Sequence, residues 1–396
     1  MRPTRIALAV TLAAACAPPA PPERVFFGNL HSHTAFSDGT GTPEDAYTRA
    51  RDSAGLHFLA ITDHNYPGSD GTGDRKDGVE MGREPTLYTG PRPDAIILTA
   101  RRMSEDGRFI ALYGQEFSAQ DSGNHMNVFE VDAVIDVPSG RFDSLVGWMT
   151  ARPEAQRHLP IVQLNHPVRY DRADEYGADD FDTPATWIAT LDRFVRLIEV
   201  VNGPWAAPIQ GPPDEVMEAD YRHFLNLGFH VAPTANQDNH YSNWGTVNDI
   251  RTGVVATALT RDAILAALRN RHAYATEDKN LEVVARVNGR LAGSIIDAIP
   301  AAGAALDVTL TIRDADEPDA TYSVTVYSDA GPGGPAADSV ASFPLRGDSP
   351  ARRPYRLDGV QFQGTGSYLY LRVTQTGPDA RTDRAWLAPV WFEGRP

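Results

Sequence analysis

The amino-acid sequence predicts an α/β fold built on a parallel sheet, followed by a small all-β, sandwich-like region. Short apolar runs typical of strands alternate with helical patterns between about residues 25 and 282. After about residue 288 the helical patterns stop, and short alternating runs are separated by Gly, Pro and Asp. We therefore expect a leader and tether over residues 1–23, a large domain over 24–283 and a β domain over 284–396.

The predicted parallel sheet rests on apolar runs that are each the length of one strand. Helices between them are indicated by their caps. Thr42 followed by Pro43 predicts a helix over residues 43–53, Gly228 ends one over 218–227, and Thr260 precedes one over 261–269. The strand-like runs are residues 25–30, 58–62, 110–114, 128–131, 161–164, 195–201 and 230–234.

The first residues have the pattern of a bacterial export signal. Arg2 and Arg5 precede an apolar stretch over 6–12, which is too short to span a bilayer, and three alanines then offer a cleavage site. Cys16, the only cysteine, follows these alanines, where bacterial lipoproteins carry their lipid. We expect a periplasmic or outer-surface lipoprotein, attached to a membrane through lipidated Cys16 and a stiff proline-rich tether over 17–23. Ordinary cleavage, giving a soluble periplasmic protein, is the alternative.

The net charge of the chain limits the classes of partner that it can bind. A formal net charge of −16 argues against nucleic acid or an anionic membrane surface, but not against a small anionic substrate bound at metal cations.

The polar residues 66–94 predict a long insertion, which could cover the entrance to a site. Tyr368 and Tyr370 alternate with leucines and share one face, which we expect to pack against a neighbouring domain; a ligand platform is the alternative.

Residues that bind metals appear where the predicted strands end. In parallel α/β folds these ends converge on one face, so residues distant in sequence would meet there. Each residue alone has an ordinary explanation: Asp38 before Gly39, for example, could simply shape a turn. Together, nitrogen and oxygen ligands without a thiolate predict two or three divalent ions, Zn, Mn or Fe. The predicted ligands are His31, His33, Asp38, His64, Glu116, His125, His166, Asp238 and His240.

The other histidines lack this context, so we assign them structural or surface roles. They are His57, His158, His223, His230 and His272.

The ordered motifs resemble those of the polymerase-and-histidinol-phosphatase (PHP) metallohydrolase superfamily, and among them an exported branch that includes carbaryl-hydrolase-like proteins. The resemblance covers roughly residues 25–282. It implies a distorted (β/α)7 PHP barrel that carries up to three metals. The motifs are His31-Ser32-His33, Thr62-Asp63-His64, Glu116, Asn165-His166-Pro167 and Asp238-Asn239-His240.

The resemblance also implies how the ligands divide among the metals. One metal would be held by His31, His33, Glu116 and Asp238. Glu116 would bridge to a second metal, held by His125 and His166. Asp38, His64 and His240 would hold the third, with Asp38 standing where many relatives have histidine. Glu199 also occurs in the related exported proteins, and we expect it beside the ligands rather than among them.

These features predict a phosphoesterase that uses metal-bound hydroxide on a small phosphorylated substrate. Glu116 would be the bridging ligand, and Asp63 would orient a metal-bound histidine. Arg169 would either grip a phosphate oxygen or form a surface salt bridge. Asn65 and Asn239 would either donate to the substrate or shape turns.

Two other functions are compatible with the same residues. The cluster could hydrolyse an amide, carbamate or carboxylic ester, in which case inorganic phosphate should not inhibit it. Alternatively, the chain could be a non-catalytic surface binding protein with structural metals, although structural sites need fewer ligands than are present here.

Overall fold

The structure is a computed structural model that describes residues 22–65, 81–82, 84–118, 125–138, 140–167, 176–301, 303–328, 338–346, 353–357 and 366–394. Cys16 with its leader, Arg169 and most of the predicted 66–94 insertion therefore lie outside the described residues. No helix within these ranges has both the length and the apolar character required to cross a membrane.

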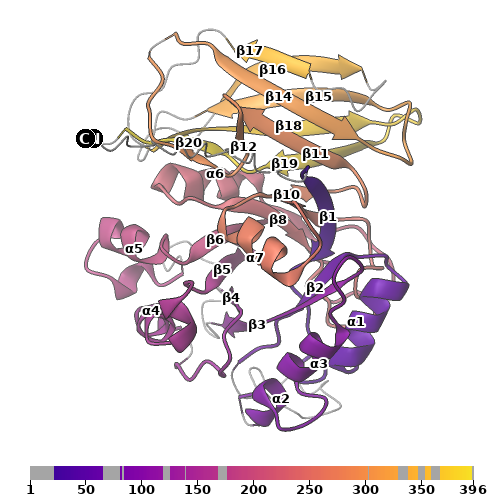
Figure 1. The fold of residues 1–396 in the computed structure, drawn as a ribbon, viewed down its shortest axis with the longest axis vertical. Coiled ribbons are helices and arrows are strands. Elements are labelled where there is room, and N and C mark those ends of the chain that lie inside the picture. The colour runs from indigo at the N-terminus through magenta and orange to yellow at the C-terminus, as the bar shows by residue number, and fades with distance from the viewer. Residues whose placement is uncertain are drawn as a thin grey trace, which may run out of the picture.

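A large mixed sheet of 16 described strands runs through the molecule (Figure 1). In its N-terminal part, β1 (Arg24–Asn29), β2 (Phe58–Ile61) and β3 (Ile110–Ser118) are parallel neighbours. Further along, β5 (Ile161–Asn165), β6 (Val195–Asn202) and β8 (Ala232–Asn236) are parallel as well. All seven predicted apolar runs contribute to these strands or to β4.

The prediction of a (β/α)7 barrel is wrong. Strand β4 (His125–Phe129) runs antiparallel to both β3 and β5, and only the six residues 119–124 separate it from β3. A connection this short cannot carry the crossover that two parallel strands need. On the other side of the sheet, β9 (Arg251–Ala256) pairs antiparallel with β1 and with β10 (Ala273–Thr276).

The C-terminal strands extend the same sheet instead of forming a separate sandwich. Strand β10 pairs with β19 (Thr382–Leu387), which pairs with β18 (Ser367–Thr376). The expected domain boundary at residues 283 and 284 falls inside β11 (Glu282–Val287). The remaining strands of the large sheet are β7 (Glu215–Val216), β13 (Ile295–Ile296), β15 (Thr321–Ser328), β16 (Asp338–Arg346) and β20 (Val390–Phe392).

A second sheet of four strands covers this C-terminal extension (Figure 1). It has the order β12-β11-β14-β17, with β12 at Arg290–Leu291, β14 at Leu306–Arg313 and β17 at Arg353–Leu357. Its apolar side chains, such as Val308 and Leu310, share one buried cluster with Val324 and Leu371 of the large sheet. The apolar alternation of these strands thus fills a core between two sheets.

Three helices match their sequence-based bounds and caps. Helix α1 (Pro43–Asp52) begins at Thr42, whose hydroxyl accepts from the Asp45 amide. Helix α7 (Arg261–Arg269) begins at Thr260, and α6 (Glu218–Leu227) ends at Gly228, whose φ of 107° favours glycine. The other described helices are α2 (Thr86–Thr89), α3 (Ile96–Met103), α4 (Phe142–Thr150), α5 (Pro184–Leu191) and the 3-10 turns Pro153–Gln156 and Ala178–Asp180.

Helix α6 lies between the N-terminal strands and the C-terminal extension (Figure 1). The Tyr368 hydroxyl donates to Asn226 Oδ1 at 2.8 Å, and the Tyr370 hydroxyl donates to Glu218 Oε1 at 3.1 Å. The tyrosine face of β18 therefore packs against the rest of the molecule, which confirms the preferred interpretation over a ligand platform.

Candidate metal centre

Strand geometry brings the nine predicted ligands to one edge of the sheet. Residues after β1, β2, β5 and β8 meet there because these strands run in the same direction, and Glu116 lies near the end of β3. His125 is the first residue of β4. Because β4 runs the opposite way, its start lies at the edge where its neighbours end.

Main-chain hydrogen bonds continue between the loops beyond the strands. The His33 amide donates to the Asn239 carbonyl at 2.8 Å, and the Glu116 amide donates to the Asp63 carbonyl at 3.1 Å. Main-chain hydrogen bonds alone therefore hold together the segments that carry these ligands.

Glu116 stands at the centre of the cluster and is only 1% exposed. Its Oε1 lies 3.2 Å from His31 Nε2, 2.9 Å from His125 Nδ1 and 3.4 Å from His166 Nε2. Its Oε2 lies 3.2 Å from both His33 Nε2 and His64 Nδ1. Each oxygen of this carboxylate therefore faces its own group of imidazoles.

Asp238 completes a second convergence with the two histidines that follow β1. Its Oδ1 lies 3.2 Å from Nε2 of His31 and 3.2 Å from Nε2 of His33, and these two nitrogens are 3.3 Å apart. Ligands about 2.1 Å from a tetrahedral metal are separated by about 3.4 Å. The three atoms thus have the spacing of ligands around one ion.

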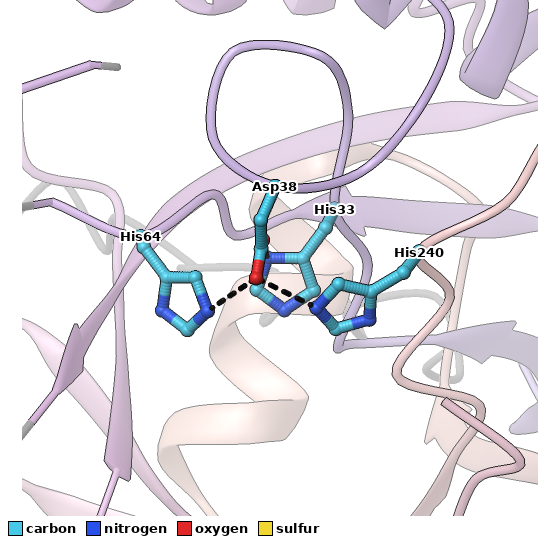
Figure 2. A group of neighbouring side chains, drawn as sticks. All are labelled: His33, Asp38, His64 and His240. Atoms are coloured by element: carbon cyan, nitrogen blue, oxygen red, sulfur yellow. Dashed lines mark ion pairs between the residues drawn. The ribbon is translucent and has the colours of Figure 1, made fainter. Parts of the chain in front are cut away.

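Asp38 gathers a third group at the outer side of the cluster (Figure 2). Its carboxylate lies between two imidazoles, with Oδ2 3.4 Å from His64 Nε2 and 3.3 Å from His240 Nε2. His33 lies behind it, with Nδ1 3.6 Å from Asp38 Oδ1. This group is less buried than the other two convergences, since the Asp38 side chain is 16% exposed.

Four overlapping groups in the described residues could each hold a metal ion. Within each group the candidate ligand atoms lie within 4.8 Å of one another. Because the groups share members, any ions they held would be neighbours. The groups are His31-Glu116-His166, His31-His33-Asp238, His64-Glu116-His125 and His33-Asp38-His64-His240.

The electrostatics of the cluster suit a cation. Burial opposes charge on His33, but the hydrogen bonds that this imidazole donates to Asp238 and Glu116 outweigh burial and raise its pKa to about 10. Burial also opposes charge on Glu116 and Asp238, yet the surrounding imidazoles hold both carboxyl pKa values well below the usual range. Burial lowers the pKa of His125 to about 4, which keeps this ring neutral, as a ligand must be. The carboxylates thus attract positive charge that a divalent ion can supply instead of protons.

Glu199 supports the cluster from behind. Its Oε1 lies 2.9 Å from His31 Nδ1, so the opposite ring nitrogen of His31 points toward Glu116 and Asp238. The His166 amide and the Asn202 side chain donate to Oε2 at 2.7 and 2.8 Å. A carboxylate in this position fixes the ring orientation of a metal-binding histidine.

Asp63 acts on a loop rather than directly on an imidazole. Its carboxylate accepts from the amide and hydroxyl of Thr34 at 2.7 and 2.6 Å, and from the Ser37 hydroxyl at 2.6 Å. Ser37 Oγ in turn lies 3.4 Å from His33 Nδ1. The contacts differ from those predicted, because Asp63 reaches His33 only through Ser37.

Two of the predicted ligands have a strained backbone. His166 and Asp238 have φ values of 32° and 48°, in a region that residues other than glycine seldom adopt. Such conformations persist only where surrounding contacts impose them, and they concentrate at functional sites.

Asn65, Asn239 and the five remaining histidines lie outside the ligand groups. The Asn65 amide group donates to the Ile135 carbonyl at 3.0 Å, and Asn239 accepts from Asn29 at 3.0 Å. Both contacts join residues far apart in sequence, so they connect distant segments and are not the local turn contacts of the alternative. The five histidines assigned structural or surface roles belong to none of the four ligand groups.

Sequence reasoning gave no role to three residues that contact the cluster, of which only Asn165 belongs to a predicted motif. Ser118 Oγ lies 2.8 Å from His64 Nδ1, Asn165 donates to Glu116 Oε1 at 2.9 Å, and the Trp205 ring meets that of His240 edge-on at 5.6 Å. The position of Ser118, two residues after Glu116 on a strand, could have revealed it, since alternate residues share a face. Trp205 gave no such indication, because it lies on a loop far from the other residues in sequence.

Comparison with known proteins gives little beyond this geometry. No family model matches the chain. The chain is similar to an uncharacterized protein of Chlamydia muridarum (strain MoPn / Nigg), with 22% identity over 409 residues that cover 93% of this chain. It spans 57% of the length of that relative.

Proposed function

We propose that this protein is a metal-dependent phosphoesterase of the PHP kind, acting on a small phosphorylated substrate. The observation that carries the proposal is the position of the Glu116 carboxylate. Its two oxygens face separate groups of imidazoles at 2.9–3.4 Å. A carboxylate in this position can bridge two ions. Bound divalent ions would supply an activated water and stabilise the charge that develops on the reacting phosphoryl group.

The proposed metal content is two or three ions of Zn, Mn or Fe. Imidazole and carboxylate ligands without thiolate suit these metals. The family resemblance suggests that His31, His33, Glu116 and Asp238 would hold one ion, Glu116, His125 and His166 a second, and Asp38, His64 and His240 a third. The spacing of the ligand atoms supports this division for the first and third ions. For the second ion it does not, since His125 groups with His64, and His166 groups with His31.

The protein residues contribute position and charge. Glu199 and Ser37 fix the orientations of His31 and His33, and the strained turns at His166 and Asp238 hold their side chains in the cluster. The three ligand carboxylates do not fully neutralise two or three divalent ions. A centre with net positive charge therefore attracts a phosphoryl dianion, even in a chain with a formal charge of −16.

The test combines metal analysis with turnover. The purified wild type would be analysed for bound metals and assayed against phosphomonoester, phosphodiester and carboxyl-ester chromogens. Glu116→Gln keeps the size of the side chain but removes its charge. Glu218→Gln is the matched control, because Glu218 also accepts hydrogen bonds but lies outside the cluster.

We expect bound transition metals and phosphoesterase activity in the wild type and in Glu218→Gln. Glu116→Gln should lose metal and at least about 100-fold in activity, as expected when a charged metal ligand is removed. Cleavage of carboxyl esters alone would favour the amide, carbamate or ester hydrolase instead. Bound metal without any turnover would favour a binding protein.

We further propose that the chain is exported and carries a lipid on Cys16. In a bacterial host, labelled palmitate should enter the wild type but not Cys16→Ser, which keeps the rest of the leader unchanged. Incorporation into both proteins, or into neither, would argue against lipidation at this residue.

A further inference from the structure

Exposed apolar side chains concentrate beside the metal centre. The described residues contain seven exposed large hydrophobic side chains; Trp205, Ile209 and Tyr241 lie on two neighbouring loops, and Val216 lies in strand β7, which follows the first of these loops. The exposed fractions are 44% for Trp205, 76% for Ile209, 41% for Val216 and 37% for Tyr241. The other three are Leu98, Ile295 and Ile299, in different parts of the fold.

The two loops are joined to each other, so their side chains form one surface. Asn243 donates to the Ala207 carbonyl at 2.8 Å, and the Gly211 amide donates to the Val247 carbonyl at 3.1 Å. The Trp205 amide donates to Asp214 Oδ2 at 3.1 Å. The loop that carries Trp205 is therefore held along the loop that carries His240 and Tyr241.

Trp205 stands at the outer ligand group. Its ring lies 5.6 Å from the His240 ring at an interplanar angle of 75°, and His240 Nε2 lies 3.3 Å from Asp38 Oδ2. Close to half of the indole side chain is nevertheless open to solvent. A large aromatic group that borders a polar cluster and stays exposed can cover an apolar part of a ligand.

We infer that Trp205 forms a subsite for an apolar, preferably aromatic, group of the substrate next to the bond that is cleaved. This inference rests on the proposed hydrolytic function and names the class of substrate. The metal centre would take the charged phosphoryl group, while the indole face covers the leaving group. A protein partner is a poorer occupant, because stable interfaces use about 20–30 residues a side, whereas the contact of an exposed hydrophobic residue with the centre is that of Trp205 with His240.

The test compares two substrates with alcohol leaving groups of similar acidity. Ethyl phosphate and benzyl phosphate differ mainly in the apolar group, so intrinsic reactivity contributes little to the comparison. Covering one face of the phenyl ring should lower KM for benzyl phosphate about tenfold relative to ethyl phosphate. Trp205→Ala should abolish this preference by raising KM more for benzyl phosphate than for ethyl phosphate, and Trp205→Phe should retain most of it.

Ile299→Ala is the matched control, since Ile299 is an exposed apolar residue elsewhere in the fold. It should leave both KM values unchanged. Metal content and circular dichroism of each variant show whether the fold and the centre are intact. Equal KM values for the two substrates in the wild type, or an equal change for both in Trp205→Ala, would overturn the subsite.

Failure of the subsite and failure of the phosphoesterase function give different results. If phosphates are not cleaved, benzyl and ethyl acetate are compared in the same variants. A Trp205-dependent preference for benzyl acetate would refute the phosphoesterase and keep the subsite. If neither class is cleaved, calorimetric binding of benzylphosphonate against ethylphosphonate decides, and equal affinity for both would refute the subsite.

Discussion

At the scale of single residues, the centre is built from pairs in which one side chain fixes another. Glu199 fixes the ring orientation of His31, and Ser37 connects the carboxylate of Asp63 to the ring of His33. The motifs predicted the inner residues because they follow strands, where side chains converge. They did not predict the Ser37 connection, because the direction of a loop side chain depends on the folded chain and not on sequence spacing.

Asp63→Asn should destabilise the loop over residues 34–37. The carboxylate accepts three hydrogen bonds at 2.6–2.7 Å while fully buried, and an amide would turn one acceptor into a donor facing a donor. We expect a loss of about 2–3 kcal/mol in the free energy of unfolding. Urea titration measures this, and a loss under about 0.5 kcal/mol would contradict the proposed support.

Asp238→Asn should separate ligand chemistry from backbone strain. Asn tolerates positive φ as well as Asp does, so the φ of 48° should persist and the chain should fold. The neutral amide is a weaker ligand between His31 and His33, and metal content should fall by about one ion per chain. Unchanged metal content by elemental analysis would exclude Asp238 as a ligand.

At the scale of elements, strand positions were predictable but strand directions were not. The run over residues 128–131 indicated a strand from its apolar side chains, yet nothing in that run specified an antiparallel β4. The decisive feature was the short connection from β3. The predicted strand over residues 110–114 ended at Gly114, whereas β3 extends to Ser118, and Glu116 and Ser118 of this extension contact the imidazoles of the centre. Because these polar residues interrupt the apolar pattern, the connection between β3 and β4 looked longer in the sequence than it is in the structure.

Docking of α6 on β18 gives a test at this scale. Tyr368→Phe removes the hydroxyl that donates to Asn226 Oδ1 at 2.8 Å and leaves that oxygen buried. We expect a loss of about 1–2 kcal/mol in unfolding free energy, with unchanged metal content because α6 carries no ligand. Tyr241→Phe is a control at an exposed tyrosine and should change stability by less than about 0.5 kcal/mol. Equal effects of the two substitutions would contradict the docking role.

At the scale of the whole molecule, the N- and C-terminal parts share one sheet. The change of pattern after residue 288 correctly indicated all-β structure, but pairing of β10 with β19 joins residues more than 100 positions apart, which local patterns cannot reveal. His230 adds a second tie, because its Nδ1 lies 2.8 Å from Asp192 and its Nε2 lies 2.7 Å from Glu393 near the C-terminus.

This second tie predicts a pH dependence of stability. Burial opposes charge on His230, but Asp192 and Glu393 raise the pKa of this imidazole from 6.5 to about 9. The charged form therefore stabilises the fold fully below pH 6.5, and its contribution is lost as the pH rises through about 9. Wild type should exceed His230→Gln by about 1–3 kcal/mol at pH 6, with the difference shrinking toward pH 10.

His57→Gln provides a control of opposite sign. Burial lowers the pKa of His57, so its contribution is present above its ordinary pKa and falls as the pH drops. Urea titrations of the three proteins from pH 5 to pH 10 measure both trends. A difference between wild type and His230→Gln that does not change with pH would refute the charged tie.

The hydrogen bond between Asn29 and Asn239 spans 210 positions of the chain, and two proposed metal ligands lie beside it, His31 two residues after Asn29 and Asp238 directly before Asn239. An ion shared by His31 and Asp238 would act as a cross-link that closes a loop of this length. Closing such a loop removes roughly 5 kcal/mol of entropy from the unfolded chain, by analogy with a disulfide. The single-cysteine chain would thus use metal where disulfide-bonded proteins use pairs of cysteines. Removal of the metal by a chelator would therefore make the chain more susceptible to proteolysis as well as abolish the proposed activity.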